Sequence, residues 1–502
     1  MTLQGIGGRR ERPLGARVAR LSLVLALVYG GLTLGAGYWQ VFRADDLSRD
    51  PADAGVIAAA RSVVRGRVLD RDGHILATSR RDAAGEPYRV YADASLSAPL
   101  GYTSRLYGSA GLEAAYASEL LGAGGDDPAS RALAKFRPRG QRGDDMRTSL
   151  SLSLQRLAVQ LLGTDRGAVV ALDPRTGDVL AMASTPTYDA SGIANPATSR
   201  AAFAAARDDP GQPLLDRAIQ GRYVPGSVFK IVTAIAGLSS GAITPATTFP
   251  QQPGAESTGL LVDGFRVRDG HHLFTGSELL DFNRATEVSC NIWYALAGLR
   301  TGGTGMDEAA RRLGFGAPIP FDLATASSQL TNGGGRLPGG FADDVELANA
   351  AYGQGEVLVT PLQMALVAAT VANGGVEPRP RLVTAFVSPS GVVRDASSGT
   401  LGRVLSAGDA AAITVAMTQA VEGADGQRFT SGAQVAGVTV AGKTGTAQLG
   451  GTGEPHSWFI GFAPAEAPTI AIAVVVEQGG HGGARAAPLA GEILAAFLAA
   501  KP

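Results

Sequence analysis

The chain contains very little cysteine. Cys290 is the only cysteine among 502 residues, so no disulfide can form within the chain. A small fold stapled by disulfides is therefore excluded, and the chain has to be held together by hydrophobic cores. Because one core rarely serves this length, we expect two or more domains.

An excess of positive charge is also absent. The chain has 44 basic and 45 acidic residues, for a formal net charge of −1. A nucleic-acid-binding protein needs a basic surface, so we expect no nucleic acid partner. The five histidines, which include the adjacent pair His271 and His272, show no spacing typical of metal sites. We therefore expect no metal site.

Lysine is scarce as well. Only four of the 44 basic residues are lysine, and the rest are arginine. Arginine does not lose its proton in a protein, whereas a buried lysine can become a neutral base. A coding bias would explain the scarcity, but Lys230 and Lys443 stand in short motifs with hydroxyl residues. Lys135 and Lys501 have no such neighbours, and we expect both to be solvated.

One long hydrophobic run lies near the N-terminus. Residues 21–42 carry no charge and are numerous enough to cross a bilayer as a helix. Five arginines precede this run, which places the N-terminus in the cytoplasm and the chain after Arg43 outside. The alternative is a cleaved signal peptide, but the run is longer than its usual hydrophobic region. We expect a basic tail at 1–20 and a single-pass membrane anchor at 21–42.

The exported part divides into two regions. Residues 43–147 are polar with short strand-like pieces, and the stretch 65–77 predicts a hairpin around a D-x-x-G turn. We interpret this region as a pedestal or dimerisation-like module. Residues 148–502 form the second domain, in which stronger helix and strand patterns occur.

The pattern in residues 148–502 predicts an α+β fold with an antiparallel sheet flanked by helices. The expected strands are 167–172, 179–183, 438–443, 458–462 and 469–476. The expected helices are 151–162, 227–238, 278–299, 306–313, 361–372 and 486–499.

Ser227 and Lys230 are three residues apart at the start of a predicted helix, so their side chains face the same way. A desolvated Lys230 has a lowered pKa and can accept the proton of a nucleophilic serine. The free N–H groups of the first turn favour a developing anion. The alternative is an ordinary capping serine followed by a solvated lysine.

Ser289, Cys290 and Asn291 supply a second hydroxyl and an amide two residues apart. The hydroxyl of Ser289 could relay a proton, and the amide of Asn291 could bind a peptide carbonyl. The alternative is a polar turn between helices. We expect Cys290 to be a packed small side chain and not a nucleophile, because no histidine flanks it.

A third motif, residues 443–446, is expected to end a strand. Lys443 could hold a substrate carboxylate there, and Gly445 would let a substrate backbone lie against the strand edge. The N–H of Thr446 could join that of Ser227 as an oxyanion hole. The alternative is a surface turn that closes a hairpin.

The three motifs together are more specific than any one of them. The set SxxK, SxN and KTG, in this order, occurs in class A β-lactamases and penicillin-binding proteins. From about Arg61 onward the chain resembles class B penicillin-binding proteins, the D,D-transpeptidases that cross-link peptidoglycan. Further stretches that resemble this family are 65–73, 111–113, 167–189, 353–363 and 458–462. Residues 107–113 are most similar to the short penicillin-binding-protein-A type.

The resemblance implies a penicillin-recognising serine transpeptidase fold and an acyl-enzyme mechanism. Ser227 would attack the D-Ala-D-Ala carbonyl of a stem peptide, Lys230 would act as base, and Ser289 would relay a proton. The terminal D-Ala is released, and an amine of a neighbouring stem peptide resolves the acyl-enzyme. β-Lactams would acylate the same serine, and the family uses no metal or organic cofactor.

The resemblance also implies how substrate is held. Asn291 would bind the peptide, and the carboxylate-holding residues would be Lys443, Thr444 and Thr446. A lone transpeptidase implies a partner glycosyltransferase of the multispanning shape, elongation, division and sporulation (SEDS) type, contacted through the anchor and the N-terminal module. The role in elongation, division or sporulation and the acceptor amine stay open.

Proteins with other functions also contain the SxxK, SxN and KTG motifs. A β-lactamase is shorter and has no anchor or N-terminal module of this kind. A carboxypeptidase differs only in that water replaces the acceptor amine, and the motifs do not exclude it. A β-lactam sensor or a wall scaffold with dispensable catalysis is the alternative from another class. The intact Ser227 and Lys230 argue against a pure scaffold.

Overall fold

The computed structural model describes residues 25, 28, 29, 31, 63–122, 142–269, 278–426, 430–450 and 453–500. The chain divides into two units, residues 1–61 and 62–502, and the second holds both large sheets. The tail predicted at 1–20 lies outside the described residues, as does nearly all of the anchor predicted at 21–42. Among the residues that are described, no helix is long and apolar enough to cross a membrane.

A five-stranded antiparallel sheet forms the centre of the larger region, as the sequence predicts. Its strand order is β15-β16-β17-β7-β8, so β15 lies at one edge. The strands are β7 (Gly167–Leu172), β8 (Val179–Thr185), β15 (Ala441–Ala447), β16 (His456–Ala463) and β17 (Ile470–Val476).

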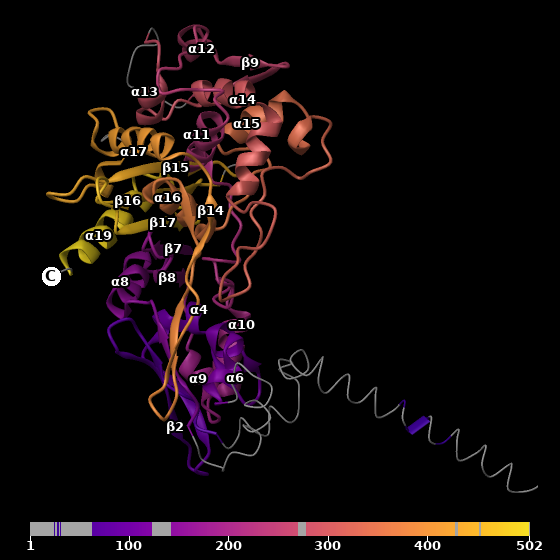
Figure 1. The fold of residues 1–502 in the computed structure, drawn as a ribbon, viewed down its shortest axis with the longest axis vertical. Coiled ribbons are helices and arrows are strands. Elements are labelled where there is room, and N and C mark those ends of the chain that lie inside the picture. The colour runs from indigo at the N-terminus through magenta and orange to yellow at the C-terminus, as the bar shows by residue number, and fades with distance from the viewer. Residues whose placement is uncertain are drawn as a thin grey trace, which may run out of the picture. The chain divides into compact units, whose positions relative to one another are not determined.

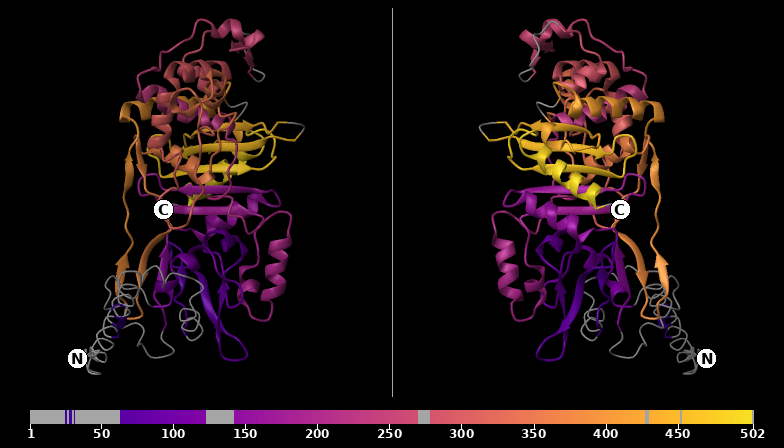
Figure 2. Two further views of the ribbon diagram at one scale, coloured as in Figure 1. Left: turned by 90° about the vertical axis from the view of Figure 1, so that its right-hand side faces the viewer. Right: turned by 90° about the vertical axis from the view of Figure 1, so that its left-hand side faces the viewer.

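Both faces of this sheet are covered by helices, which explains why its inner strands β7 and β17 are wholly apolar. In β17, Ala473 and Val475 belong to one core, and Ile472 and Val474 belong to the other, because successive side chains point to opposite faces. Helices α8 (Leu152–Leu162) and α19 (Ala486–Ala499) pack on the second face. Figures 1 and 2 show the sheet between its helical layers.

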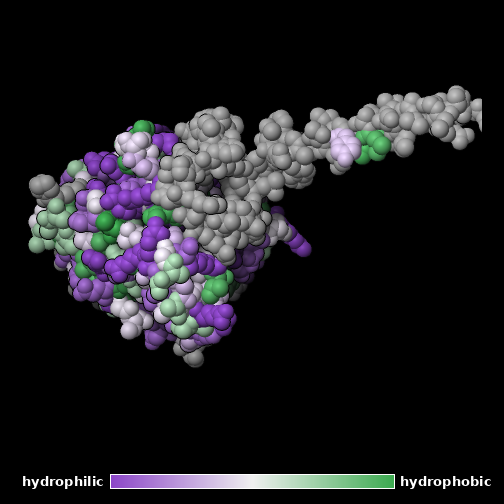
Figure 3. Space-filling view, turned by 90° about the horizontal axis from the view of Figure 1, so that it is seen from below, coloured by the Kyte–Doolittle hydropathy of each residue, from purple (hydrophilic) through white to green (hydrophobic). Residues whose placement is uncertain are grey.

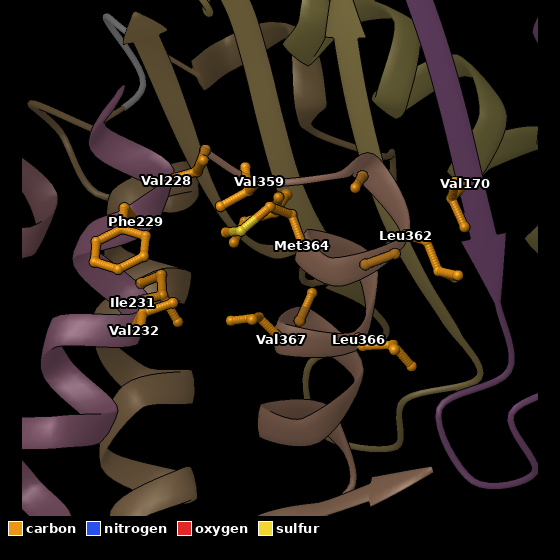
Figure 4. Close-up of a cluster of buried hydrophobic side chains, with 14 of the residues drawn as sticks. Val170, Val228, Phe229, Ile231, Val232, Val359, Leu362, Met364, Leu366 and Val367 are labelled. Atoms are coloured by element: carbon orange, nitrogen blue, oxygen red, sulfur yellow. The ribbon is translucent and has the colours of Figure 1, made fainter. Parts of the chain in front are cut away.

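Helices α16 (Pro361–Ala372) and α17 (Ala407–Glu422) pack on the first face. The helices next to the predicted site pack on these two or on one another, and they are α11 (Lys230–Ser239), α13 (Phe282–Glu287), α14 (Asn291–Arg312) and α15 (Asp344–Ala351). Figure 4 shows Ile231 of α11 facing Val367 of α16, and Leu362 of α16 beside Val170 of β7. The apolar packing therefore fixes α11 relative to the sheet.

Several predicted boundaries were wrong, most of them close to the predicted site. The helix predicted at 278–299 is two helices, because the chain turns at 288–290 between α13 and α14. The helix predicted at 306–313 is confirmed, because non-helical backbone at Gly302 separates it from the first part of α14. The first turn of the helix predicted at 227–238 is a 3-10 turn, η2 (Gly226–Phe229). Strand 438–443 starts later and continues to Ala447.

A second, six-stranded sheet includes the hairpin predicted at 65–77. Its order is β13-β12-β6-β1-β2-β3, and only β1 and β6 are parallel. The strands are β1 (Val68–Leu69), β2 (Ile75–Arg81), β3 (Pro87–Tyr91), β6 (Asp145–Thr148), β12 (Val383–Val387) and β13 (Val393–Asp395). Two of its strands thus come from residues 383–395, which no local sequence pattern revealed.

The part of the chain before β6 is held by a buried ion cluster as well as by apolar packing. Glu113 is fully buried and pairs with Arg65 and Arg89, which are also buried.

Seen from below, the described surface is mostly hydrophilic, with hydrophobic side chains in small separate groups (Figure 3).

Short elements complete the described chain. They are η1 (Ala94–Leu96), α4 (Ser97–Leu100), β4 (Thr103–Ser104), β5 (Gly108–Ser109), α5 (Gly111–Ala115), α6 (Ala117–Leu120), α9 (Ala190–Ala194), α10 (Ser199–Asp208), α12 (Gln252–Thr258), β9 (Leu260–Val262), β10 (Phe265–Val267), η3 (Pro338–Gly340), β11 (Val376–Pro378), β14 (Thr400–Arg403) and η4 (Ser431–Ala433).

Candidate active site

The turn that presents Ser227 depends on two glycines with left-handed backbone. Gly226 has φ 58° and Gly353 has φ 82°, a region that side-chain-bearing residues rarely adopt. The N–H of Gly226 donates to the carbonyl of Gly353 at 2.9 Å. A Cβ atom on Gly353 would lie 1.9 Å from the carbonyl oxygen of Gly226. The stretch that begins at Gly353, noted in the sequence for its family resemblance, thus supports the serine turn.

Lys230 lies at the centre of the site. Its Nζ donates to Ser227 Oγ at 3.1 Å, to Ser289 Oγ at 3.1 Å and to Asn291 Oδ1 at 2.8 Å. It also donates to the carbonyl of Ser289. The side chain is fully buried, which rules out the alternative of a solvated lysine. Two of the three predicted motifs therefore meet at one amine.

The environment of Lys230 favours its neutral form. Burial lowers the pKa of Lys230 from 10.5 to about 8, while the charges of Asp269 and Cys290 act in the opposite direction. The ring of Tyr294 lies 5.6 Å from Nζ and gives some stabilisation to the cation. Desolvation is the larger effect, so the lysine can serve as a base near neutral pH.

The SxN motif occupies the turn between α13 and α14. Ser289 has φ 60°, which is unusual for a residue with a side chain and is retained only where surrounding contacts hold it. This backbone directs both the carbonyl and the hydroxyl of Ser289 to Lys230. The motif is a polar turn between helices, and it also contacts Lys230.

Lys443 brings the third motif to the same place. Its Nζ donates to Ser289 Oγ at 2.8 Å, so the hydroxyl of Ser289 lies between two lysines. Lys443 is only 2% exposed, and the surface-turn alternative is therefore wrong. Burial lowers the pKa of Lys443 well below its ordinary value, and the neighbouring charge of Lys230 lowers it further. A bound carboxylate would restore the charged form.

The structure gives a reason for Gly445 that the sequence did not predict. A Cβ atom there would lie 2.7 Å from the carbonyl oxygen of Pro225 and 3.1 Å from Val228 Cγ1. Gly445 is therefore needed so that η2 can pack directly against β15. Similarly, a Cβ atom on Gly226 would lie 2.7 Å from the carbonyl oxygen of Thr446. The backbones of the serine turn and of the edge strand touch.

Two groups of supporting residues were missed in the sequence. Asp269 accepts hydrogen bonds at the start of α14, and its 22-residue separation from Asn291 gave no signal. Glu477 accepts from Tyr223 at 2.9 Å and from the buried Arg217 at 2.8 Å. Tyr223 precedes the serine turn by a few residues, so this network steadies the segment that leads to Ser227.

Among the described residues, two clusters of three His, Cys, Asp or Glu side chains could hold a metal ion. In each cluster the ligand atoms lie within 4.8 Å of one another. The clusters are Asp70, Asp72 and His74, and Glu256, Asp269 and Cys290. In the second cluster the thiol of Cys290 donates to Glu256 at 3.3 Å and to Asp269 at 3.2 Å. Burial raises the pKa of Cys290 well above its ordinary value, in keeping with a packed thiol. The absence of a metal stays a prediction.

Comparison with known proteins decides the family. The penicillin binding protein transpeptidase domain matches residues 167–495, which is well over half of the chain. The chain belongs to the penicillin-binding protein transpeptidase family. In addition, the penicillin binding protein A dimerisation domain matches residues 65–146 of this penicillin-binding protein.

Relatives confirm the resemblance to the penicillin-binding-protein-A type. The peptidoglycan D,D-transpeptidase PbpA of Mycobacterium tuberculosis H37Rv is 34% identical over 97% of this chain and 100% of its own length. PbpA of Mycolicibacterium smegmatis is 35% identical over 96% of this chain and 98% of its own. The penicillin G acyl-enzyme complex of penicillin-binding protein A from M. tuberculosis is 32% identical, with a TM-score of 0.75, and covers 87% of this chain and all of that one.

Proposed function

We propose that Ser227 is the acylated nucleophile of this peptidoglycan D,D-transpeptidase. The observation that carries the assignment is the convergence of Ser227, Ser289 and Asn291 on the desolvated amine of Lys230. The family, and acyl-enzyme complexes of a relative with β-lactams, support the serine-type reaction. β-Lactams acylate the same serine.

The contacts support a proton path for acylation. Neutral Lys230 takes the hydroxyl proton as Ser227 Oγ attacks the carbonyl carbon of the penultimate D-Ala. Ser289 Oγ, which accepts from both Lys230 and Lys443, passes its proton to the leaving nitrogen and takes one in turn from Lys230, which becomes neutral again. The C–N bond breaks, D-Ala leaves with that proton, and the stem peptide stays esterified to Ser227. An acceptor amine then attacks the ester and regenerates the serine.

The remaining residues hold the substrate. Lys443 and the hydroxyls of Thr444 and Thr446 bind the terminal carboxylate, which recharges Lys443 as it binds. The N–H groups of Ser227 and Thr446 stabilise the oxyanion, as the contact between the serine turn and β15 supports. The peptide extends along the free edge of β15, and Asn291 binds one of its carbonyl groups.

Covalent labelling with fluorescent penicillin tests the nucleophile. The full-length protein should be labelled, Ser227→Ala should not, and Ser240→Ala should behave as wild type. Ser240 is a suitable control because it lies at the end of α11, where its hydroxyl donates only to backbone carbonyls of that helix. Labelling that persists in Ser227→Ala would refute the assignment.

Hydrolysis is the second candidate reaction, because the same acyl-enzyme can react with water. Incubation of purified protein with a stem pentapeptide, with and without an amine acceptor, separates the two. A transpeptidase gives the amide-linked product when the acceptor is present. If the only product were the peptide shortened by D-Ala at every acceptor concentration, the protein would be a carboxypeptidase.

Membrane anchoring and a partner belong to the same proposal. Residues 21–42 form a single-pass helix with residues 1–20 in the cytoplasm and the catalytic domain outside. A SEDS-type glycosyltransferase supplies the strands and contacts the anchor and the N-terminal module. Membrane fractionation, protease digestion of intact spheroplasts and copurification with the polymerase test this. Recovery of an unanchored protein in the cytoplasm would contradict it.

A further inference from the structure

The segment that follows β10 lies against the start of helix α14 and touches Asn291 in two ways. The carboxylate of Asp269 accepts hydrogen bonds from the backbone N–H of Asn291 and, at 3.3 Å, from that of Ile292. The carbonyl of Arg268 accepts from Asn291 Nδ2 at 3.0 Å. No motif includes Arg268 or Asp269.

Helix α14 depends on these hydrogen bonds from another segment because its own N-cap residue is a weak one. The N-cap residue is Cys290, whose Sγ accepts from the N–H of Trp293 at 3.2 Å. Sulfur is a poor acceptor, and cysteine is not among the residues that cap helices well. The first N–H groups of a helix have no partners within it, so the carboxylate of Asp269 satisfies two that Cys290 cannot.

The carboxamide of Asn291 is held at both ends. Its Oδ1 accepts from Lys230 Nζ at 2.8 Å, and its Nδ2 donates to the carbonyl of Arg268. The lysine therefore fixes which end of the amide is the oxygen. An amide nitrogen carries two hydrogens, so Arg268 takes one and a substrate carbonyl can take the other.

We propose that Asp269 is a positioning residue for Asn291 and so for recognition of the substrate's amide carbonyl. This rests on the proposed function, in which Asn291 binds that carbonyl. Asp269 holds the backbone of Asn291, and the adjacent Arg268 carbonyl aims its side chain. The turn at Ser289, with its left-handed backbone, is held from the same side through the thiol of Cys290, which donates to Asp269.

The test compares two penicillins on the full-length protein. Penicillin G carries an acylamido carbonyl, whereas 6-aminopenicillanic acid lacks it. Loss of one aimed hydrogen bond is worth about tenfold, so Asp269→Ala should slow acylation by penicillin G about tenfold or more. Acylation by 6-aminopenicillanic acid should fall much less, because it does not use the amide of Asn291. Asp269→Asn keeps an acceptor oxygen and should restore part of the rate.

Asp343→Ala is the matched control. Asp343 caps α15 by accepting from the N–H of Glu346 at 2.8 Å, and neither residue belongs to the three motifs. The control should lose helix stability without altering either rate. An equal loss with both penicillins, no loss in Asp269→Ala, or the same discrimination in Asp343→Ala would overturn the proposal.

Two further outcomes are separable. If wild-type protein is not acylated at Ser227 at all, the proposed function fails. If wild-type protein is acylated, but Asp269→Ala has the same ratio of rates for penicillin G and 6-aminopenicillanic acid as wild type, only the positioning role fails. Acylation of wild type should also survive dialysis against a chelator. Loss on chelation that added zinc reverses would show that Asp269 acts through a bound ion with Glu256 and Cys290, and would refute direct positioning.

Discussion

Four oxygen atoms surround the amine of Lys230, on which the proposed chemistry depends. Its side chain is fully buried. The only described lysines are Lys230 and Lys443, and both lie in this site. The predicted solvation of Lys135 and Lys501 concerns residues outside the described ranges.

Replacement of Lys230 by arginine should abolish acylation. Arginine keeps the charge but cannot act as a neutral base, and its planar head does not fit the contacts of an ammonium group. General base catalysis contributes about 10²–10⁴-fold, so the rate constant for fluorescent penicillin should fall by at least that much. Lys135→Arg is the control and should keep the wild-type rate. A labelled Lys230→Arg protein would show that another group is the base.

The pH dependence of acylation should follow the same lysine. Burial lowers the pKa of Lys230 to about 8, so the acylation rate constant should rise with pH through a midpoint near that value. In the unfolded chain Lys230 has its ordinary pKa of 10.5, so the unfolded state binds this proton more tightly. Lys230 therefore makes the free energy of unfolding increase with pH between about pH 8 and pH 10.5. Stopped-flow acylation across pH checks this, and a rate independent of pH would contradict it.

At the scale of elements, the site forms where the serine turn meets the edge strand. Gly445 belongs to β15, and Pro225 and Val228 belong to the segment that it meets. Pro225 contributes its backbone carbonyl and Val228 a side-chain methyl group, and the contact leaves no space for another methyl group. The helix, the strand and the SxN turn are thus fixed relative to one another by close packing.

Gly445→Ala should impair acylation for this reason. The added methyl group would have to push η2 away from β15, which separates the proposed oxyanion donors, and a rate loss of about 10²-fold is the scale for one lost donor. Gly408→Ala in α17 is the matched control, since its nearest neighbour would be Ser406 Oγ at 3.7 Å. The comparison uses acylation rates together with thermal unfolding. Equal rates in both variants would mean that the turn adapts.

At the scale of the whole chain, the six-stranded sheet joins residues that are far apart in sequence. Strand β12 pairs with β6, and Phe386 of β12 lies opposite Met146. Both side chains are buried in one core with residues of the N-terminal module. The transpeptidase domain therefore depends on this module for the completion of its own strands.

A fragment that starts at residue 149 should consequently fail to fold stably. It would lack β1, β2, β3 and β6, and so expose one edge of β12 and the side chain of Phe386. A fragment of residues 63–502 is the control and should be soluble and labelled by fluorescent penicillin. Size-exclusion chromatography and labelling compare the two. A monomeric, fully labelled short fragment would show that the module is dispensable for folding.

The sequence by itself determined the antiparallel sheet, the helices 361–372 and 486–499 and the residues of the three motifs. Their signals are local, because apolar periodicity, turn residues and short spacings can be recognised in the sequence without the structure. Only the tertiary structure decided where the turn at 288–290 breaks the helix, how β12 and β13 join the first module, and why Gly445 has to be glycine. Those features depend on contacts between distant segments, as does the support of Asn291 by Asp269. The scarcity of lysine singles out Lys230 in the sequence, but only the tertiary structure shows that its amine is buried among oxygen atoms of Ser227, Ser289 and Asn291.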